Sequence, residues 1–207
     1  MEPGGVPRRL AARRPWIVRP SSSEGVWWQR RGHEMEIYFL RHGDARAAED
    51  WKGSDAERPL SKEGTARMKK EAAAIVLLRP ALEAILTSPL VRARQTAEIV
   101  ARKLRLAKGL FVEERLAPGF GTAELKRILA ERHSLRGLLL VGHEPDFSRV
   151  ISACTGGGRV ECKKGSLIRL DMDDPTSLTG ILVWLLPPRV LAPNPPSVVP
   201  NPPSVVP

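Results

Sequence analysis

A short run of purely apolar residues in the second half of the chain, Gly137–Val141, constrains the fold more than any other feature. Its letters, G-L-L-L-V, offer no polar face, which is typical of a strand covered by other elements on both sides. Glu36–Leu40 and Ala84–Thr87 also read as strands, and Leu110–Val112 as a shorter one. A sheet buried on both faces needs helices above and below it. The pattern therefore predicts an α/β fold with three layers, α/β/α, around a mostly parallel central sheet.

Segments of helix-forming composition separate these strands, as such a fold requires. Ser61 is an expected N-cap, because its hydroxyl can accept a hydrogen bond from the first turn. Pro89 fits the first helical position, with Ser88 as the cap. Two last apolar runs, Ser166–Leu170 and Gly180–Leu185, are expected to be strands that pair at an edge of the sheet. The predicted helices cover Ser61–Leu78, Pro89–Leu104, Thr122–Arg132 and Pro145–Ala153.

The two ends of the chain differ from this central part. Residues 1–34 are rich in Pro, Gly, Ser and Arg without an apolar period, so we expect a disordered or non-native basic leader before a natural start at Met35. Near the other end, Pro193–Val199 is repeated at residues 200–206, which favours an extended, polyproline-like tail. Such a tail is either passive or a ligand for a proline-binding module. The predicted organisation is a leader at 1–34, one domain at 35–190 and a tail at 191–207.

The formal net charge of +10 points to an anionic partner. Seven arginines against three glutamates lie in residues 1–34, and over the rest of the chain Lys and Arg alternate with Glu along the expected helices. Because this part lacks a basic block with interleaved aromatic residues, a phosphorylated substrate suits the charge at least as well as nucleic acid, and we expect no nucleic-acid partner. The chain lacks a run of about 18 apolar residues, so we expect no membrane span.

The chain has two cysteines, Cys154 and Cys162. One pair cannot form a disulfide framework, and the spacing lacks the paired clusters of a zinc site. Two free thiols suit the reducing cytoplasm, which is the compartment that we expect. We expect neither a metal nor an organic cofactor.

Three charged clusters each follow a predicted strand directly: Arg41-His42-Gly43, Ser88–Arg92 and Gly142-His143-Glu144. The carboxyl ends of parallel strands meet at one rim of a sheet, where ligands bind. Two Arg and two His side chains would then converge without balancing acids, an arrangement that suits a dianion such as a phosphoryl group. Gly43 is expected to let the backbone approach that ligand closely.

His42 is the strongest candidate for a nucleophile, because it lies at a strand end between a cationic Arg41 and a flexible Gly43. A neutral imidazole can attack phosphorus if its other nitrogen donates to a carbonyl that fixes the tautomer. We expect the nearby positive charge to lower the pKa of His42 and so keep it neutral.

Four blocks occur in an order that resembles the histidine phosphatase superfamily: residues 39–45, residues 58–61 with Gly64, residues 88–97 and residues 141–145. Within it, the R-H-G-D-A opening and the compact length are most similar to the SixA-type phosphohistidine phosphatases. The resemblance spans about residues 35–190 and implies a phosphoglycerate mutase-like fold.

The resemblance also implies roles for individual residues. His42 would be the nucleophile, Arg41 and Arg92 would hold the phosphoryl oxygens, and His143 would donate to the phosphoryl group. The neighbours of these residues are expected to bind substrate: Gly43, Asp44, Ser88 and Glu144.

One departure from the family is informative. Many members carry a glutamate after the second arginine, whereas residues 116–121 hold no carboxylate, which leaves Asp44, Glu113 and Glu114 as imperfect candidates for the acid. An alkoxide leaving group needs an acid, and an imidazole needs much less help. The sequence therefore favours phosphohistidine on a protein as substrate.

Two alternatives to this function stay open: a small-molecule phosphomonoesterase or mutase that uses Asp44 or Glu114, and a non-catalytic protein that binds phosphate or nucleic acid. The oligomeric state also stays open. The short segment between Asp44 and Arg58 predicts a shallow, open pocket.

Overall fold

A computed structural model describes residues 35–174 and 176–193 of the chain. Within them, six strands form one sheet in the order β3-β2-β4-β1-β5-β6. β1 to β4 pair in parallel, and β5 and β6 add an antiparallel hairpin at the edge. The mostly parallel sheet and the pairing of the last two strands are thus confirmed. The strands are β1 (Met35–Arg41), β2 (Ala84–Thr87), β3 (Leu110–Val112), β4 (Gly137–Gly142), β5 (Leu167–Asp174) and β6 (Thr179–Leu186).

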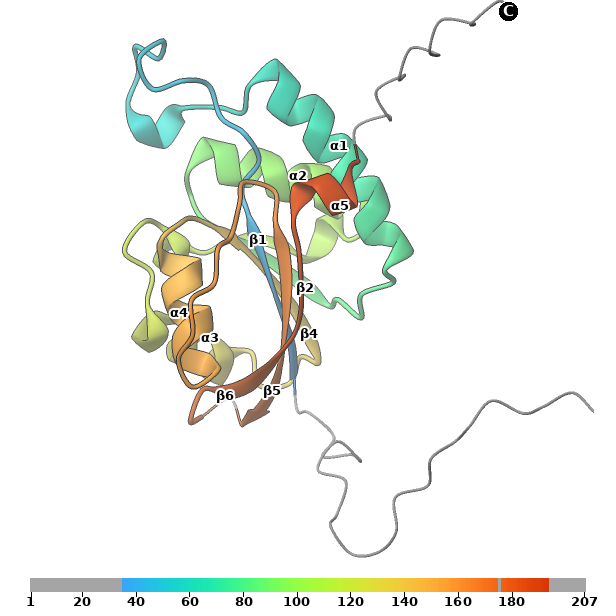
Figure 1. Cartoon of the computed structure of the whole chain (residues 1–207), viewed down its shortest axis with the longest axis vertical. Coiled ribbons are helices and arrows are strands. Elements are labelled where there is room, and N and C mark those ends of the chain that lie inside the picture. The colour runs from blue at the N-terminus through green and yellow to red at the C-terminus, as the bar shows by residue number, and fades with distance from the viewer. Residues whose placement is uncertain (1–34, 175, 194–207) are drawn as a thin grey trace, which may run out of the picture. The chain divides into compact units, whose positions relative to one another are not determined.

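Helices cover both faces of this sheet, which confirms the three layers (Figure 1). α1, α2 and α5 lie on one face, and α3 and α4 lie on the other. None of the helices within the described residues has the length and apolar character needed to cross a bilayer. The helices are α1 (Lys62–Leu77), α2 (Val91–Leu104), α3 (Thr122–Glu131), α4 (Asp146–Cys154) and α5 (Pro188–Leu191).

The central strands have continuous apolar runs because each of them contributes side chains to two cores. Side chains of a strand alternate between the faces of the sheet. Ile37 and Phe39 of β1 therefore pack in the core under α3 and α4, whereas Tyr38 and Leu40 pack in the core under α1 and α2. All four side chains are at most 2% exposed. A polar residue at any of these positions would lose its hydration without gaining a partner.

Two predicted boundaries are wrong. α2 begins at Val91 rather than Pro89, because the chain first turns through Ser88–Leu90 and the Ser88 hydroxyl accepts the Leu90 N–H at 3.3 Å. β5 runs to Asp174 rather than Leu170, because its pairing with β6 continues to that residue. Leu191 and Ala192, at the start of the predicted tail, are buried. The predicted leader 1–34 and residues 194–207 of the predicted tail lie outside the described residues.

The strand ends that carry the charged clusters lie side by side, as predicted. In the sheet register Arg41 is opposite Gly142, and Thr87 is opposite Val141. The pairing continues one residue beyond the strands, since the His42 N–H donates to the Gly142 carbonyl at 3.1 Å. The ends of β1, β2 and β4 therefore form one rim of the sheet, and the three charged clusters lie along it.

Gly64 fixes how closely α1 approaches this rim. The Ser61 hydroxyl caps α1 by accepting the Gly64 N–H at 2.8 Å, and the Ser61 N–H donates to the Asp44 carbonyl at 3.0 Å. A Cβ at Gly64 would lie 2.0 Å from that same backbone oxygen. No rotamer change can relieve a clash between a Cβ and a backbone carbonyl.

We therefore expect Gly64→Ala to push the loop after β1 away from α1. Overpacking of this kind costs roughly 1–3 kcal/mol of unfolding free energy. Chemical denaturation would measure that loss, and turnover would fall with it because the loop carries His42. Lys62→Ala is the control, because Lys62 is exposed in the same first turn of α1 and surface substitutions of this kind cost little. An unchanged midpoint for Gly64→Ala would contradict the tight approach.

Candidate active site

His42 is held as a neutral imidazole with one defined lone pair. Its Nδ1 lies 2.7 Å from the Gly43 carbonyl oxygen, which can only accept, so the ring proton is on Nδ1. The lone pair is therefore on Nε2, and the Arg92 Nε–H donates to it at 3.3 Å. This is the tautomer that a histidine nucleophile requires, and the predicted carbonyl partner is present.

Gly43 contributes both polar groups of its backbone to this site. Its carbonyl accepts from His42, and its N–H donates to the Thr96 hydroxyl at 3.0 Å. The position where its Cβ would lie faces Leu60 and Met68 at ordinary contact distances of 3.4 and 3.5 Å. Both polar groups of its backbone are engaged, so Gly43 helps to orient His42, and its approach to a ligand stays a prediction.

His143 faces His42 across the rim, with 5.1 Å between the ring centroids. Its Nε2 lies 2.7 Å from the hydroxyl of Ser88, and that hydroxyl also accepts the Leu90 N–H. The hydroxyl can donate its own proton to Nε2, which leaves the ring proton of His143 on Nδ1. Nδ1 is buried and has no hydrogen-bond partner among the described residues.

Arg41 also has an unused donor. Its Nη1 donates to the Cys162 carbonyl at 2.8 Å, which ties the end of β1 to the loop before β5. Its buried Nε, in contrast, has no partner within the described part of the chain. A buried donor without a partner is costly unless a ligand supplies the acceptor.

Arg92 reaches the site from the first turn of α2 and is only 5% exposed. Its outer edge is bound by a residue that the sequence did not single out, Asp55. Arg92 Nη1 donates to the Asp55 carbonyl at 2.7 Å, and Nη2 donates to the Asp55 carboxylate at 3.0 Å. The segment after Asp44 thus turns back onto Arg92, and the prediction of an open pocket is wrong at this edge.

Burial keeps both histidines neutral. It is the main reason why the pKa of His42 falls to about 3 and that of His143 to about 4. The neighbouring charges of Arg92 and Arg41 lower both values further. The direction for His42 was predicted correctly, but charge alone was expected to cause it, and burial contributes more.

We expect that neither ring titrates between pH 8 and pH 5. Nitrogen-detected NMR of the imidazoles would then show constant tautomers for His42 and His143 over this range. A midpoint near the ordinary value of 6.5 for either ring would contradict the burial described above.

The lowered pKa values of His42 and His143 also determine how the free energy of unfolding changes with pH. Between pH 6.5 and about 4 the unfolded chain binds more protons on these two rings, so their contribution to stability falls as the pH is lowered. Glu71 has the opposite effect, because burial raises its pKa to about 7 and the folded chain then retains a proton that the unfolded chain loses above about pH 4.5. A Glu71→Gln variant would isolate the histidine contribution in a denaturation series.

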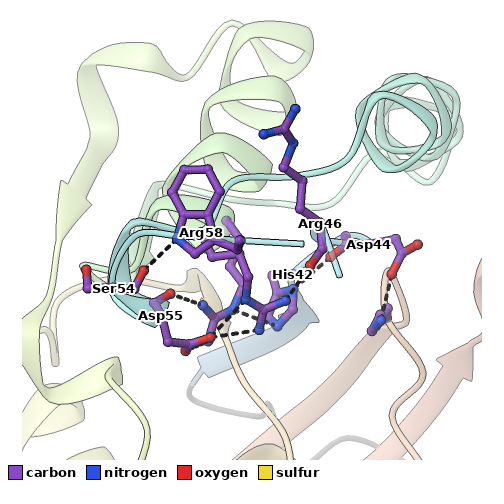
Figure 2. Close-up of polar contacts among 10 residues, drawn as sticks. His42, Asp44, Arg46, Ser54, Asp55 and Arg58 are labelled. Carbon is purple, nitrogen blue, oxygen red and sulfur yellow. Dashed lines mark hydrogen bonds and ion pairs between the residues drawn. The ribbon is translucent and has the colours of Figure 1, made fainter. Parts of the chain in front are cut away.

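The carboxylates proposed from sequence as acids are engaged elsewhere or exposed. Asp44 binds Lys164 Nζ at 2.6 Å and lies on the far side of His42 from Asp55 (Figure 2). Glu113 accepts hydrogen bonds from Arg115, which lower the pKa of Glu113. Glu114 is exposed in a 3₁₀ turn. Two of the three candidates, Asp44 and Glu113, are therefore paired with cationic side chains, and Glu114 lies at the surface.

Two residues predicted to bind substrate, Glu144 and Ser88, have protein partners in the structure, and their part in binding substrate stays a prediction. The Glu144 carboxylate accepts from the N–H and the hydroxyl of Ser148, at 3.1 and 2.5 Å, and so braces the start of α4. Ser88 is fully buried and contacts His143. We infer that both act on the site through their neighbours.

A cavity of about 770 Å³ lies beside the loop that carries His42. Arg41, Gly43 and Asp44 line one of its sides. Basic side chains outnumber acidic ones around it, so the surface next to the site favours an anionic partner. The charged residues on the cavity are Arg41, Arg67, Lys163, Lys164 and Arg189, with Asp44, Glu71 and Glu161.

Comparisons with known proteins agree with this geometry. Residues 37–146 match the model of the histidine phosphatase superfamily, branch 1. An uncharacterised protein from Picosynechococcus sp. is 40% identical over 143 residues, which cover 66% of this chain and 84% of that protein. Phosphohistidine phosphatase SixA from Escherichia coli is 26% identical over 159 residues, 74% of this chain and 94% of its own. A structure of the protein histidine phosphatase SixA with tungstate superposes with a TM-score of 0.67 at 25% identity, over 74% of this chain and 97% of that one.

Proposed function

Because the chain belongs to the histidine phosphatase superfamily, we propose that it is a phosphatase that removes the phosphoryl group from phosphohistidine on a protein, through a phosphorylated His42. Membership of this superfamily is the evidence for phosphatase activity. The substrate class and the roles of the residues rest on the arguments that follow.

The observation that carries the mechanism is a pair of buried donors, Arg41 Nε and His143 Nδ1, that lack partners among the described residues and lie beside the lone pair on His42 Nε2. A phosphoryl group bound to His42 supplies acceptor oxygens for both donors. With Arg92 they place positive charge and N–H groups where charge develops in the transition state. The dianion would satisfy groups that are otherwise costly to bury.

Two displacements complete the reaction. In the first, the Nε2 lone pair of His42 forms a bond to phosphorus, the bond from phosphorus to the substrate nitrogen breaks, and its electron pair leaves with the imidazole. In the second, a water oxygen attacks phosphorus, the bond from phosphorus to Nε2 breaks, and the pair returns to His42. The proton released by water balances the one that the departing imidazole takes up from solvent.

The partners of the candidate acids support a nitrogen leaving group. Loss of an alkoxide requires a proton donor, whereas imidazole is a far better leaving group. Asp44 and Glu113 are both bound to cationic side chains. The similarity to a protein named phosphohistidine phosphatase, and the cationic cavity beside His42, point to the same substrate class.

A side-by-side assay tests the proposal. Phosphohistidine on a carrier protein, p-nitrophenyl phosphate and a sugar phosphate are offered to the same enzyme, and kcat/KM is measured for each. We expect the phosphohistidine protein to exceed the sugar phosphate by at least about 10²-fold, the effect of a missing acid. The p-nitrophenolate group leaves without a proton donor, so p-nitrophenyl phosphate reports phosphoryl transfer as such. Equal or faster turnover of the sugar phosphate would favour a small-molecule phosphomonoesterase, and binding without turnover of any substrate would indicate a non-catalytic protein.

A further inference from the structure

Asp55 contacts the site without being one of its reacting groups. It lies in a 3₁₀ turn, Asp55–Glu57, within the irregular segment between β1 and α1. Figure 2 shows its carboxylate turned toward the guanidinium of Arg58, with His42 close by. The carboxylate is shared, since Oδ2 accepts from Arg92 and Oδ1 accepts from Arg58 at 2.9 Å.

The segment that carries Asp55 is itself fixed by several contacts. Arg58 Nη1 donates to the Arg46 carbonyl at 2.6 Å, and the Trp51 indole donates to the Ser54 carbonyl at 2.8 Å. The Ser54 hydroxyl donates to the Glu57 carboxylate at 2.8 Å, which closes the turn. Asp55 therefore presents its carbonyl and its carboxylate to Arg92 from a defined backbone position.

The two hydrogen bonds from Arg92 to Asp55 determine which edge of the Arg92 guanidinium faces His42. Nη1 and Nη2 each give one N–H to Asp55, so the guanidinium plane is held at two points. The Nε–H is then left to point at His42 Nε2, the atom that would carry the phosphoryl group. Without these two hydrogen bonds, rotation about the side-chain torsions of Arg92 would move this N–H away from the reacting atom.

We propose that Asp55 is a positioning residue for phosphoryl transfer, which orients Arg92 through its carbonyl and carboxylate while Arg58 shares the negative charge. The inference rests on the proposed roles of His42 and Arg92. It does not depend on whether the leaving atom is nitrogen or oxygen.

A role as the missing acid does not fit Asp55. The hydrogen bond from Arg58, together with the charge of Arg92, lowers the pKa of Asp55, so the carboxylate is ionised at neutral pH. An ionised carboxylate cannot protonate a leaving group. Its charge can hold a guanidinium, and that is the contact observed.

The test compares Asp55→Asn with Glu49→Gln. Glu49 is an exposed carboxylate in the same segment between β1 and α1. Asp55→Asn is expected to lower kcat by about 10- to 100-fold, the cost of a misplaced catalytic group, whereas Glu49→Gln should stay within about threefold of wild type. Asp55→Glu, which keeps the charge, should recover part of the loss.

Two further readouts separate positioning from damage to the fold. Removal of the carboxylate leaves Arg92 and Arg58 less neutralised, so inhibition by inorganic phosphate should be unchanged or stronger in Asp55→Asn while kcat falls. The Arg92 Nε–H resonance should be sharp in the wild-type protein and broadened in Asp55→Asn. Loss of phosphate binding in proportion to kcat would overturn the proposal in favour of a structural role.

Other outcomes are equally decisive. An unchanged kcat in Asp55→Asn, or the same loss in Glu49→Gln, would overturn the inference about Asp55 and leave the proposed function intact. A wild-type enzyme that turns over phosphorylated substrates without ever labelling His42 would overturn the His42 mechanism, and the role of Asp55 with it.

Discussion

His42→Ala is expected to abolish turnover and covalent labelling together. Rapid quenching of the wild-type enzyme with ³²P-labelled substrate should give one acid-labile, alkali-stable phosphate on the chain, as phosphohistidine requires. The variant should show none, and its kcat should fall by about 10⁴-fold or more, because the remaining donors can stabilise charge but cannot form the intermediate.

A loss of this size has to be separated from a loss of fold. His42 is buried, so thermal denaturation of the variant must show that the domain still unfolds cooperatively. Free imidazole added to His42→Ala should restore part of the turnover, because a small nucleophile can enter the space that the ring leaves. A variant that still forms a phosphoenzyme on another histidine would contradict the assignment of the nucleophile.

Replacement of Arg92 is expected to have the second largest effect. Arg92→Lys keeps the charge but loses the planar fork that donates to His42 and to Asp55 at once. We expect kcat to fall by about 10²-fold for Arg92→Lys and about 10³-fold for Arg92→Ala, the range seen when one donor to a developing anion is removed. Single-turnover kinetics would place the loss in the formation of the phosphoenzyme.

The chain offers a matched control for this prediction. Arg94 lies two residues further along α2 and is exposed, whereas Arg92 is buried. Arg94→Lys should leave kcat within about twofold of wild type, as surface substitutions do. Equal losses for the two arginines would indicate that the charge of the helix matters and that the geometry of Arg92 does not.

The convergence of the site could be predicted from sequence because it depends on regular structure. The strands could be identified from apolar runs such as Gly137–Val141. Because parallel strands end at one rim of a sheet, the charged clusters that follow them were expected to lie together. Arg41, His42 and His143 therefore meet where they were expected. The hydrogen bond from His42 to the Gly43 carbonyl also followed, since a neutral nucleophilic imidazole needs a fixed tautomer.

Asp55 could not be predicted in the same way. Its position depends on a segment without periodicity, in which Trp51, Ser54 and Arg58 set the backbone through particular side-chain contacts. The one available signal was an acidic residue three positions before an arginine of a recognised block, and that spacing is common in surface turns. Glu144 was predicted to bind substrate because it follows His143, and the contact of its carboxylate with Ser148 was not predicted. Its part in binding substrate stays a prediction.

The location of Asp55 has a consequence for how such an enzyme can change. The irregular segment between β1 and α1 is where insertions and deletions are best tolerated, and it borders the site, so it is the natural place to remodel substrate recognition. It also carries the carboxylate that steadies Arg92. Substrate selectivity and turnover rate thus depend on the same segment. A replacement of this segment that is intended to change substrate recognition would have to retain Asp55 and Arg58 to preserve turnover.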